Sequence, residues 1–285
     1  MAYQPGHMRL LARGGQADIY EVDEHKVLRM LRNANDEKAL KAEQAIMALL
    51  SDRGVGVPAV YEYVTVNGLP GLVMQRLKGP SMLQLMMQKP LGAASFARDF
   101  ARLHHDVLKQ PAVVGLMEIK DRVNYLIDQS PLLDEQDRRF VRSQLAELPT
   151  GDRLMHGDFH PGNILTEGGK HYIIDWFGAA KGHYVSDIAH TYALLADKPR
   201  IPGENALKHW FVRAFARRFA GKYLREIRRS TGFSMEEFGR WLAVRAAERT
   251  VYGQPSELMT KAAFVKACGV MQQRGISPSQ WHKAL

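Results

Sequence analysis

The 285-residue chain lacks several features that would each define a class of protein. Its single cysteine, Cys268, excludes an internal disulfide and any zinc site built from cysteines. No run reaches the roughly 18 consecutive apolar residues that a membrane-spanning helix needs, and the N-terminal residues lack the apolar stretch of a secretory signal. Repeats and low-complexity tracts are also missing, which excludes a solenoid. We therefore expect a globular, cytoplasmic protein without a transmembrane segment.

Acidic residues are fewer than basic ones, 30 against 39, so the chain carries a net charge of +9 at pH 7. Much of the excess lies in residues 198–250, which contain thirteen Lys or Arg against five Asp or Glu. This pattern is typical of a solvated helix face, and an anion-binding surface is the alternative. Because no nucleic-acid-binding motif accompanies the charge, we expect no obligatory nucleic-acid partner. The basic residues at mostly helical spacing are Arg213, Arg217, Arg218, Lys222, Arg225, Arg228 and Arg229.

The first 78 residues predict a small sheet with one helix. A helix is predicted over residues 35–50, and the dipeptide Asn67-Gly68 is a strong signal for the turn of a hairpin. Short runs typical of strands occupy residues 19–22, 27–31, 60–65 and 72–77.

After Gly79-Pro80, which we interpret as a linker, apolar residues recur at helical spacing. Two short strands are expected at residues 163–166 and 172–175. The sequence thus predicts an α+β protein with two lobes. A small antiparallel-sheet lobe with one helix would cover residues 1–78, and a large, mostly helical lobe would cover residues 79–285. A ligand is expected in the cleft between them.

The strongest chemical signal is the run HGDFHPGN at residues 156–163, followed by IIDW at residues 173–176. From average residue usage, H-G-D-x-x-x-x-N should arise by chance in about one such chain per thousand. Phosphoryl transfer from a nucleotide needs one carboxylate that orients the attacking hydroxyl, and further oxygen ligands for Mg²⁺. Asp158, Asn163 and Asp175 supply this set, and the predicted strands would let them converge.

The first lobe contains residues suited to bind a nucleotide. Gly15 and Gln16 lie in a glycine turn between apolar runs, where backbone N–H groups can approach phosphates. Arg29 lies inside an apolar strand, where an unpaired cation is costly. The predicted helix places Glu43 on the same face as its apolar residues, so we expect an Arg29–Glu43 ion pair. The pair either presents the guanidinium to the α- and β-phosphates or is an ion bridge that binds no nucleotide.

The motifs HGDFHPGNIL, IIDW and SDIA resemble those of the aminoglycoside phosphotransferase and choline kinase superfamily, which has a protein-kinase-like fold. The resemblance covers nearly the whole chain. It implies a kinase that uses ATP and Mg²⁺ to phosphorylate a hydroxyl of a small molecule. It also implies that Asp158 is the catalytic base and that Asn163 and Asp175 are metal ligands. His156 and Asp187 would support the catalytic loop structurally.

The resemblance also suggests where adenine and the acceptor bind. It places the hinge between the lobes near Gln75 and Leu77, whose backbone groups would bond adenine. Leu72 and Met74 would form apolar walls around the ring. His160, inside the catalytic motif, is a candidate neighbour of the substrate.

The charge distribution bears on the identity of the substrate. A polycationic aminoglycoside needs an acidic pocket, yet the C-terminal helices are the most basic part of this chain. We therefore expect a neutral or anionic hydroxyl compound.

Two other functions stay open. A protein Ser/Thr kinase shares the fold, although no A-P-E signature follows Asp175 and residues 178–185 are too few for a long activation segment. A non-catalytic nucleotide-binding scaffold is the second alternative, although a decayed site would not need all three polar residues.

Overall fold

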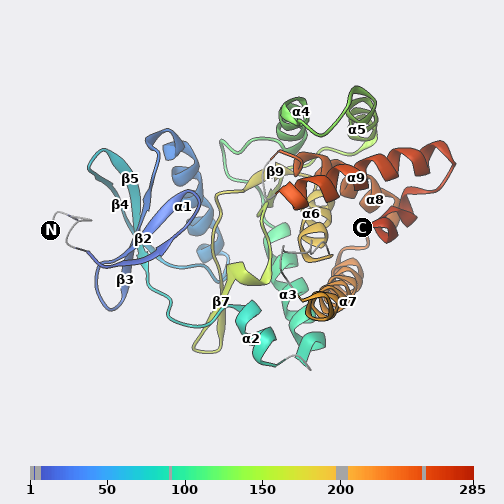
Figure 1. Cartoon of the computed structure of the whole chain (residues 1–285). Coiled ribbons are helices and arrows are strands. Elements are labelled where there is room, and N and C mark those ends of the chain that lie inside the picture. The colour runs from blue at the N-terminus through green and yellow to red at the C-terminus, as the bar shows by residue number, and fades with distance from the viewer. Residues whose placement is uncertain (1–2, 4–7, 90–91, 197–204, 252–254) are drawn as a thin grey trace. The chain divides into compact units, whose positions relative to one another are not determined.

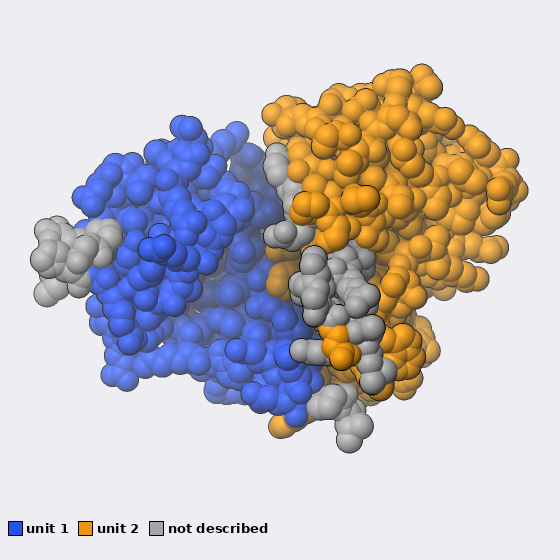
Figure 2. Space-filling model, viewed as in Figure 1, with its two compact units in different colours: residues 1–88, 113–116, 161–179 blue, residues 89–112, 117–160, 180–285 orange. Residues whose placement is uncertain are grey.

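The chain divides into two units in the computed structural model, which describes residues 3, 8–89, 92–196, 205–251 and 255–285 (Figures 1 and 2). The expected division into lobes after residue 78 stays a prediction. The first unit contains residues 1–88, 113–116 and 161–179, and the second contains residues 89–112, 117–160 and 180–285.

An antiparallel sheet of five strands opens the first unit, in the spatial order β1-β2-β3-β5-β4. Four of its strands correspond to the runs predicted from the sequence. The first strand was not predicted, because its four residues are all exposed and show no apolar alternation. The strands are β1 (Leu10–Arg13), β2 (Ala17–Glu21), β3 (Lys26–Leu31), β4 (Val60–Val66) and β5 (Leu69–Gln75).

The register of the sheet depends on a tight turn between β4 and β5. Asn67 has a φ of 52° and Gly68 a φ of 78°, and these are the residue types that adopt a left-handed conformation with least strain. The expected hairpin is therefore present. The pairing of the central strands then places Arg29 opposite Ile19 on β2 and opposite Leu72 on β5.

One helix, α1 (Glu37–Asp52), contacts β5 of this sheet. It begins two residues later than predicted, because residues 34–36 form a 3-10 turn capped by the side chain of Asn33. On its outer face, Glu37 and Lys41 form an ion pair at 2.8 Å. The buried residues recur at three- and four-residue steps, and they are Leu40, Glu43, Ile46, Met47 and Leu50.

The segment interpreted as a linker instead packs within the first unit. The backbone N–H of Thr166 donates to the carbonyl of Pro80 at 2.9 Å, and a Cβ added to Gly79 would lie 1.9 Å from the carbonyl oxygen of Thr166. Glycine is thus required by the close approach of two backbones. The other elements of this unit are α2 (Met82–Gln88), the 3-10 helix η4 (Pro161–Asn163), β7 (Ile164–Glu167) and β8 (Lys170–Ile173).

The second unit is mostly helical, as the sequence predicted. Its helix α8 contacts α4, α5, α6 and α9, while α3 packs against α7 (Figure 1). A two-stranded sheet of β6 (Arg153–Met155) and β9 (Ala180–Gly182) flanks the catalytic motif. The helices are α3 (Ala93–Leu108), α4 (Ile119–Gln129), α5 (Glu135–Glu147), α6 (Tyr184–Ala196), α7 (Ala206–Thr231), α8 (Met235–Glu248), α9 (Pro255–Gln273) and the 3-10 helix η5 (Pro278–Ala284).

None of the helices in the described ranges is long and apolar enough to cross a bilayer. Cys268 is a buried free thiol on α9, and burial raises its pKa.

Replacing Gly79 with alanine is expected to destabilise the first unit. The added Cβ would overlap the Thr166 carbonyl, and backbone cannot move away as a side-chain tip can. We expect a loss of about 2–3 kcal/mol in the free energy of unfolding, measured by urea denaturation. Gly221→Ala in α7 is the control, because no atom lies within 4 Å of its added Cβ. Equal midpoints for Gly79→Ala and the wild type would contradict the close approach.

Candidate active site

A cavity of about 520 Å³ lies within the first unit. Its lining comes from the β1–β2 turn, β3, α1, the end of β5 and residues 174–175. The six residues that we expected to contact the nucleotide all line it, and so does Asp175. These six are Gly15, Gln16, Arg29, Glu43, Gln75 and Leu77.

The charge of Arg29 lies between two carboxylates of this cavity. Its Nη1 atom is 3.0 Å from Oε2 of Glu43, and its Nη2 atom is 3.9 Å from Oδ1 of Asp175. Arg29 is 8% exposed and Glu43 is 1% exposed, so the expected ion pair is present and almost fully buried. Apart from this ion pair with Glu43, buried Nη1 makes no hydrogen bond within the described part of the chain. Because an unmade hydrogen bond is costly in a buried place, this donor is suited to an oxygen atom of a ligand.

Burial raises the pKa of Glu43 from 4.5 to about 7, although the nearby charge of Arg29 acts in the opposite direction. The negative charge of Asp175 adds to the increase. Desolvation therefore outweighs the ion pair, as it often does for buried pairs. A further positive charge near Asp175 would favour the ionised form of Glu43.

The segment that follows β5 presents backbone groups suited to the edge of a base. The N–H of Arg76 donates to the carbonyl of His25, and the N–H of Lys78 donates to the carboxylate of Glu167, each at 2.8 Å. Between them, the N–H and C=O of Leu77 have no hydrogen bond to any described residue, and Leu77 lines the cavity. An adenine ring could satisfy both groups.

Apolar side chains surround this backbone edge. Val27, Met74 and Leu165 line the cavity from β3, β5 and β7, which matches the expected wall at Met74. Leu72, also expected as a wall, is fully buried and does not line the cavity. Both side chains point to the same face of β5, where Leu72 lies opposite Arg29 and Met74 lies opposite Val27.

Asn163 and Asp175 are brought together by the β7–β8 hairpin. The N–H of Ile174 donates to the carbonyl of Asn163 at 3.0 Å, so the two predicted metal ligands flank one backbone hydrogen bond. Asp175 has a φ of 64°, which is uncommon for a residue with a side chain and is often found at functional positions. Its side chain is 44% exposed.

This donor set fits Mg²⁺, which prefers oxygen ligands and keeps several of its waters. The residues that the structure describes contain no group of three or more His, Cys, Asp or Glu able to bind a metal ion. One carboxylate and one amide oxygen would therefore have to be completed by phosphate oxygens and water.

Residues 156–160, the part of the HGDFHPGN motif that we call the predicted catalytic loop, belong to the second unit, where Asp187 of α6 binds their backbone. The N–H groups of His156 and Gly157 donate to the Asp187 carboxylate at 2.8 Å and 3.0 Å. Gly157 has a φ of 77°, so the chain turns sharply here without a Cβ. Burial opposes the charge of Asp187, but the hydrogen bond from His104 and nearby positive charges hold its pKa at about 2.

His104 and Tyr223 complete this anchor, and neither was predicted from the sequence. The imidazole of His104 lies between Asp187 and Tyr223, with Nε2 at 3.1 Å from the Asp187 carboxylate and Nδ1 at 2.7 Å from the Tyr223 hydroxyl. The same ring stacks on Phe159 of the catalytic loop, with 4.2 Å between centroids, and Phe159 also contacts Phe100. The spacing on α3 indicated only that His104 faces the core.

Asp158 lies at the exposed edge of this rigid loop. Its side chain is 37% exposed, and Nε2 of His160 is 3.6 Å from its Oδ2. Burial would raise the pKa of Asp158, but His160, His156 and Arg249 outweigh it and hold the pKa below its ordinary value. The carboxylate is therefore ionised at neutral pH. The N–H of Asp158 donates to Nδ1 of His156, which supports the structural role expected of that histidine.

The sequence-predicted residues are thus distributed over both units. Asp158, His156, His160 and Asp187 belong to the second unit, whereas Asn163, Asp175 and the nucleotide residues belong to the first. Most of the basic residues of α7 are exposed to solvent, which agrees with a solvated helix face.

Comparisons with known proteins identify similar kinases. A model of a phosphotransferase enzyme family matches residues 7–233. No curated protein matches the chain.

Solved structures similar to the chain over nearly its whole length share the α+β fold that the sequence predicted. A thermostable mutant of aminoglycoside phosphotransferase APH(4)-Ia has 15% identity and a TM-score of 0.65, with 94% of each chain covered. The amicoumacin kinase hAmiN, solved with AMP-PNP, Ca²⁺ and Ami, has 17% identity and a TM-score of 0.64, with 100% of this chain and 93% of that chain covered. A choline/ethanolamine kinase family protein from Mesorhizobium loti has 16% identity and a TM-score of 0.62, with 98% and 92% covered.

Glu43→Gln is expected to remove a pH dependence of stability. The folded pKa of about 7 exceeds the ordinary 4.5, so the folded state binds a proton that the unfolded state has released between these values. This contribution to stability is complete below the unfolded pKa and is lost as the pH rises through about 7. In urea denaturation without nucleotide, the variant should gain on the order of 2 kcal/mol over the wild type between about pH 5 and about pH 8.

The matched control is Glu37→Gln on the exposed face of the same helix, where the pKa of the carboxyl is lowered by Lys41. That variant should show no gain at high pH. If the difference between Glu43→Gln and the wild type is the same at both pH values, Glu43 is not the buried acid described above.

Proposed function

The chain belongs to the phosphotransferase enzyme family, and on that premise we propose that it is a cytoplasmic kinase that uses ATP and Mg²⁺ to phosphorylate a hydroxyl of a small molecule. The observation that carries the proposal is the cavity of the first unit. There the buried guanidinium of Arg29 lies beside Asp175. The backbone N–H and C=O of Leu77, which lines the same cavity, have no hydrogen bond to any described residue.

The first unit would bind the nucleotide. Leu77 offers one donor and one acceptor to adenine, and Met74 and Val27 enclose the ring. Arg29 would contact the α- and β-phosphates, with Glu43 fixing the direction of its guanidinium. The turn at Gly15 has room for a close approach, because no atom lies within 4 Å of a Cβ built there.

Asn163 and Asp175 would coordinate the metal through their side-chain oxygens. When bound, Mg²⁺ neutralises negative charge that develops on the transferred phosphoryl group. The backbone at Asp175 is left-handed, and its exposed carboxylate lies 3.9 Å from Nη2 of Arg29.

Asp158 would orient the acceptor. Its carboxylate accepts a hydrogen bond from the hydroxyl, whose oxygen attacks the γ-phosphorus while the bond to the β–γ bridging oxygen breaks. The hydroxyl proton passes to Asp158 and then to solvent. Because the pKa of Asp158 is lowered, this transfer is favourable only late in the reaction, when the hydroxyl oxygen has become strongly acidic. Its earlier contribution is therefore orientation of the acceptor.

The acceptor proposed is a neutral or anionic compound and not a polycationic aminoglycoside, although an aminoglycoside kinase and an amicoumacin kinase are among the similar structures. Transfer of label from radioactive ATP to protein would instead favour a protein kinase. A chain that binds Mg-ATP and shows no turnover with any hydroxyl compound would favour a scaffold.

Asp158→Asn should leave nucleotide affinity within about twofold of the wild type and lower kcat by about 100-fold or more, the scale of losing a general base. Calorimetric binding of AMP-PNP and release of ADP measure the two quantities. Asp152→Asn is the control, since its side chain is 85% exposed and lies two residues before the core of β6. A variant with unchanged kcat would refute the assignment of Asp158.

Asp175→Ala should abolish the effect of Mg²⁺ on nucleotide binding, because the exposed carboxylate is the charged member of the metal-binding pair. Titrations of AMP-PNP with and without Mg²⁺ measure this effect, and Asp158→Asn, which keeps both proposed ligands, should retain it. The same magnesium dependence in Asp175→Ala and the wild type would show that the ion is bound elsewhere.

A further inference from the structure

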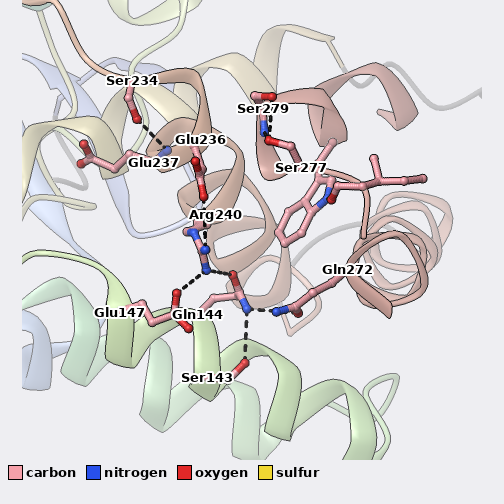
Figure 3. Close-up of polar contacts among 12 residues, drawn as sticks. Ser143, Gln144, Glu147, Ser234, Glu236, Glu237, Arg240, Gln272, Ser277 and Ser279 are labelled. Carbon is pink, nitrogen blue, oxygen red and sulfur yellow. Dashed lines mark hydrogen bonds and ion pairs between the residues drawn. The ribbon is translucent and has the colours of Figure 1, made fainter. Parts of the chain in front are cut away.

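Arg240 of α8 shows how an arginine of the second unit can be fully satisfied. It pairs with Glu147 at 2.6 Å and with Glu236 at 3.4 Å, and it donates to Gln144 at 2.8 Å (Figure 3). Each side of this guanidinium therefore has an acceptor. Two later arginines, Arg245 and Arg249, differ from it.

Arg245 is fully buried and shares its carboxylate with another arginine. Its Nη1 atom is 2.6 Å from Oε2 of Glu248, while Nε of Arg122 is 2.9 Å from Oε1 of the same side chain. Among the described residues, Nε and Nη2 of Arg245 have no hydrogen-bond acceptor, and Nη1 has only this ion pair with Glu248. Asp187 offsets part of this charge, but its oxygens accept from the catalytic loop and His104.

His190, one turn after Asp187 on α6, adds to this unusual environment. It is 2% exposed, and neither ring nitrogen has a hydrogen-bond partner in the described ranges. Burial, followed by the charges of Arg245, Arg249, Arg122 and Lys261, lowers its pKa well below the ordinary value. The imidazole is therefore neutral, chiefly because it is buried, and the four nearby cations act in the same direction.

Arg249 connects this cluster to the catalytic loop. It caps the C-terminal end of α8, its side chain is partly exposed, and its guanidinium forms no ion pair or hydrogen bond with any described residue. Its positive charge nevertheless acts on Asp158 as well as on His190. A partly buried cation without an acceptor is suited to a ligand that brings its own negative charge.

We propose that Arg249 is the contact for an anionic group of the acceptor, and that the acceptor is a hydroxyl compound carrying a carboxylate or a phosphate. This inference rests on the proposed kinase function. Arg245 lies behind this contact and adds positive potential without touching the acceptor. The planar guanidinium of Arg249 can bind two oxygens of either group at once, while Asp158 binds the hydroxyl. A polycation would be repelled by the same charges.

Arg245 and Arg249 are not among the basic residues at helical spacing that stood out in the sequence. Arg213, Arg218 and Arg225 of α7 are exposed, so their charge is screened by solvent. Arg245 and Arg249 are less exposed, and the charge of Arg249 acts on Asp158. The expectation of a neutral or anionic acceptor is therefore narrowed to an anionic one, for a different reason.

The first test compares matched acceptors with the full-length chain and Mg-ATP: glycerol with glycerate and glycerol 3-phosphate, and glucose with gluconate. For the pair that is phosphorylated, the anionic member should have a kcat/KM at least about tenfold higher. Arg249→Gln should raise the KM for the anionic member about tenfold and leave the KM for the neutral member unchanged. Arg218→Gln, which removes an exposed charge, should keep the preference.

The outcomes distinguish binding of the acceptor by Arg249 from an effect of Arg249 on Asp158 alone. If Arg249→Gln lowers kcat equally for both members of a pair, Arg249 acts only on Asp158 and the proposal is wrong. It is also wrong if neutral members are the better substrates. Failure of the kinase function itself appears differently, as no Asp158-dependent ADP release with any compound.

A second test requires no turnover. With saturating Mg-AMP-PNP occupying the nucleotide site, inorganic phosphate or glycerate should raise the melting midpoint of the wild type and of Arg218→Gln, compared with chloride at equal ionic strength. Arg249→Gln should lose this increase. An equal increase in Arg249→Gln, or none in the wild type, overturns the proposal.

Discussion

The carboxylate of Asp187, which is entirely removed from solvent, fixes the geometry on which the proposed chemistry depends. It stays charged because the hydrogen bond from His104 and nearby positive charges outweigh the cost of burial, and it also accepts hydrogen bonds from two backbone N–H groups. The two N–H groups belong to His156 and Gly157, the residues that directly precede Asp158. The position of the proposed base is therefore set by its backbone, and the packing of Phe159 holds the loop from the other side.

Local patterns were sufficient for much of this arrangement. The spacing on α1 showed that Glu43 shares the face of the buried apolar residues, and an arginine inside an apolar strand required an acid nearby, so the Arg29–Glu43 pair could be predicted without coordinates. The hairpin at Asn67-Gly68 could be predicted because those residues tolerate positive φ. The same approach missed β1, whose residues are all exposed, and misjudged Gly79, whose role depends on a carbonyl that lies far along the chain.

Contacts between distant segments account for what could not be predicted. His104 binds a tyrosine 119 residues away and an aspartate 83 residues away, and no periodicity in α3 names those partners. A count of charges could not distinguish the arginines for a related reason. Residues 198–250 include both the exposed arginines of α7 and the less exposed Arg245 and Arg249, and a count gives them equal weight although solvent screens the exposed group more strongly.

Both units contain a guanidinium whose donors are not all satisfied by the described residues, Arg29 in the first and Arg249 in the second. Their surroundings differ in sign. Arg29 lies between Glu43 and Asp175, and the pKa of about 7 for Glu43 shows that adding negative charge there is already unfavourable, so a phosphate is accommodated together with a cation. Around Arg249 the charges of Arg245, Arg122 and Lys261 add to the burial that keeps His190 neutral, so an oxyanion would need no metal to accompany it. The chain would thus bind its two anionic ligands by different electrostatic means, and only the nucleotide would depend on Mg²⁺.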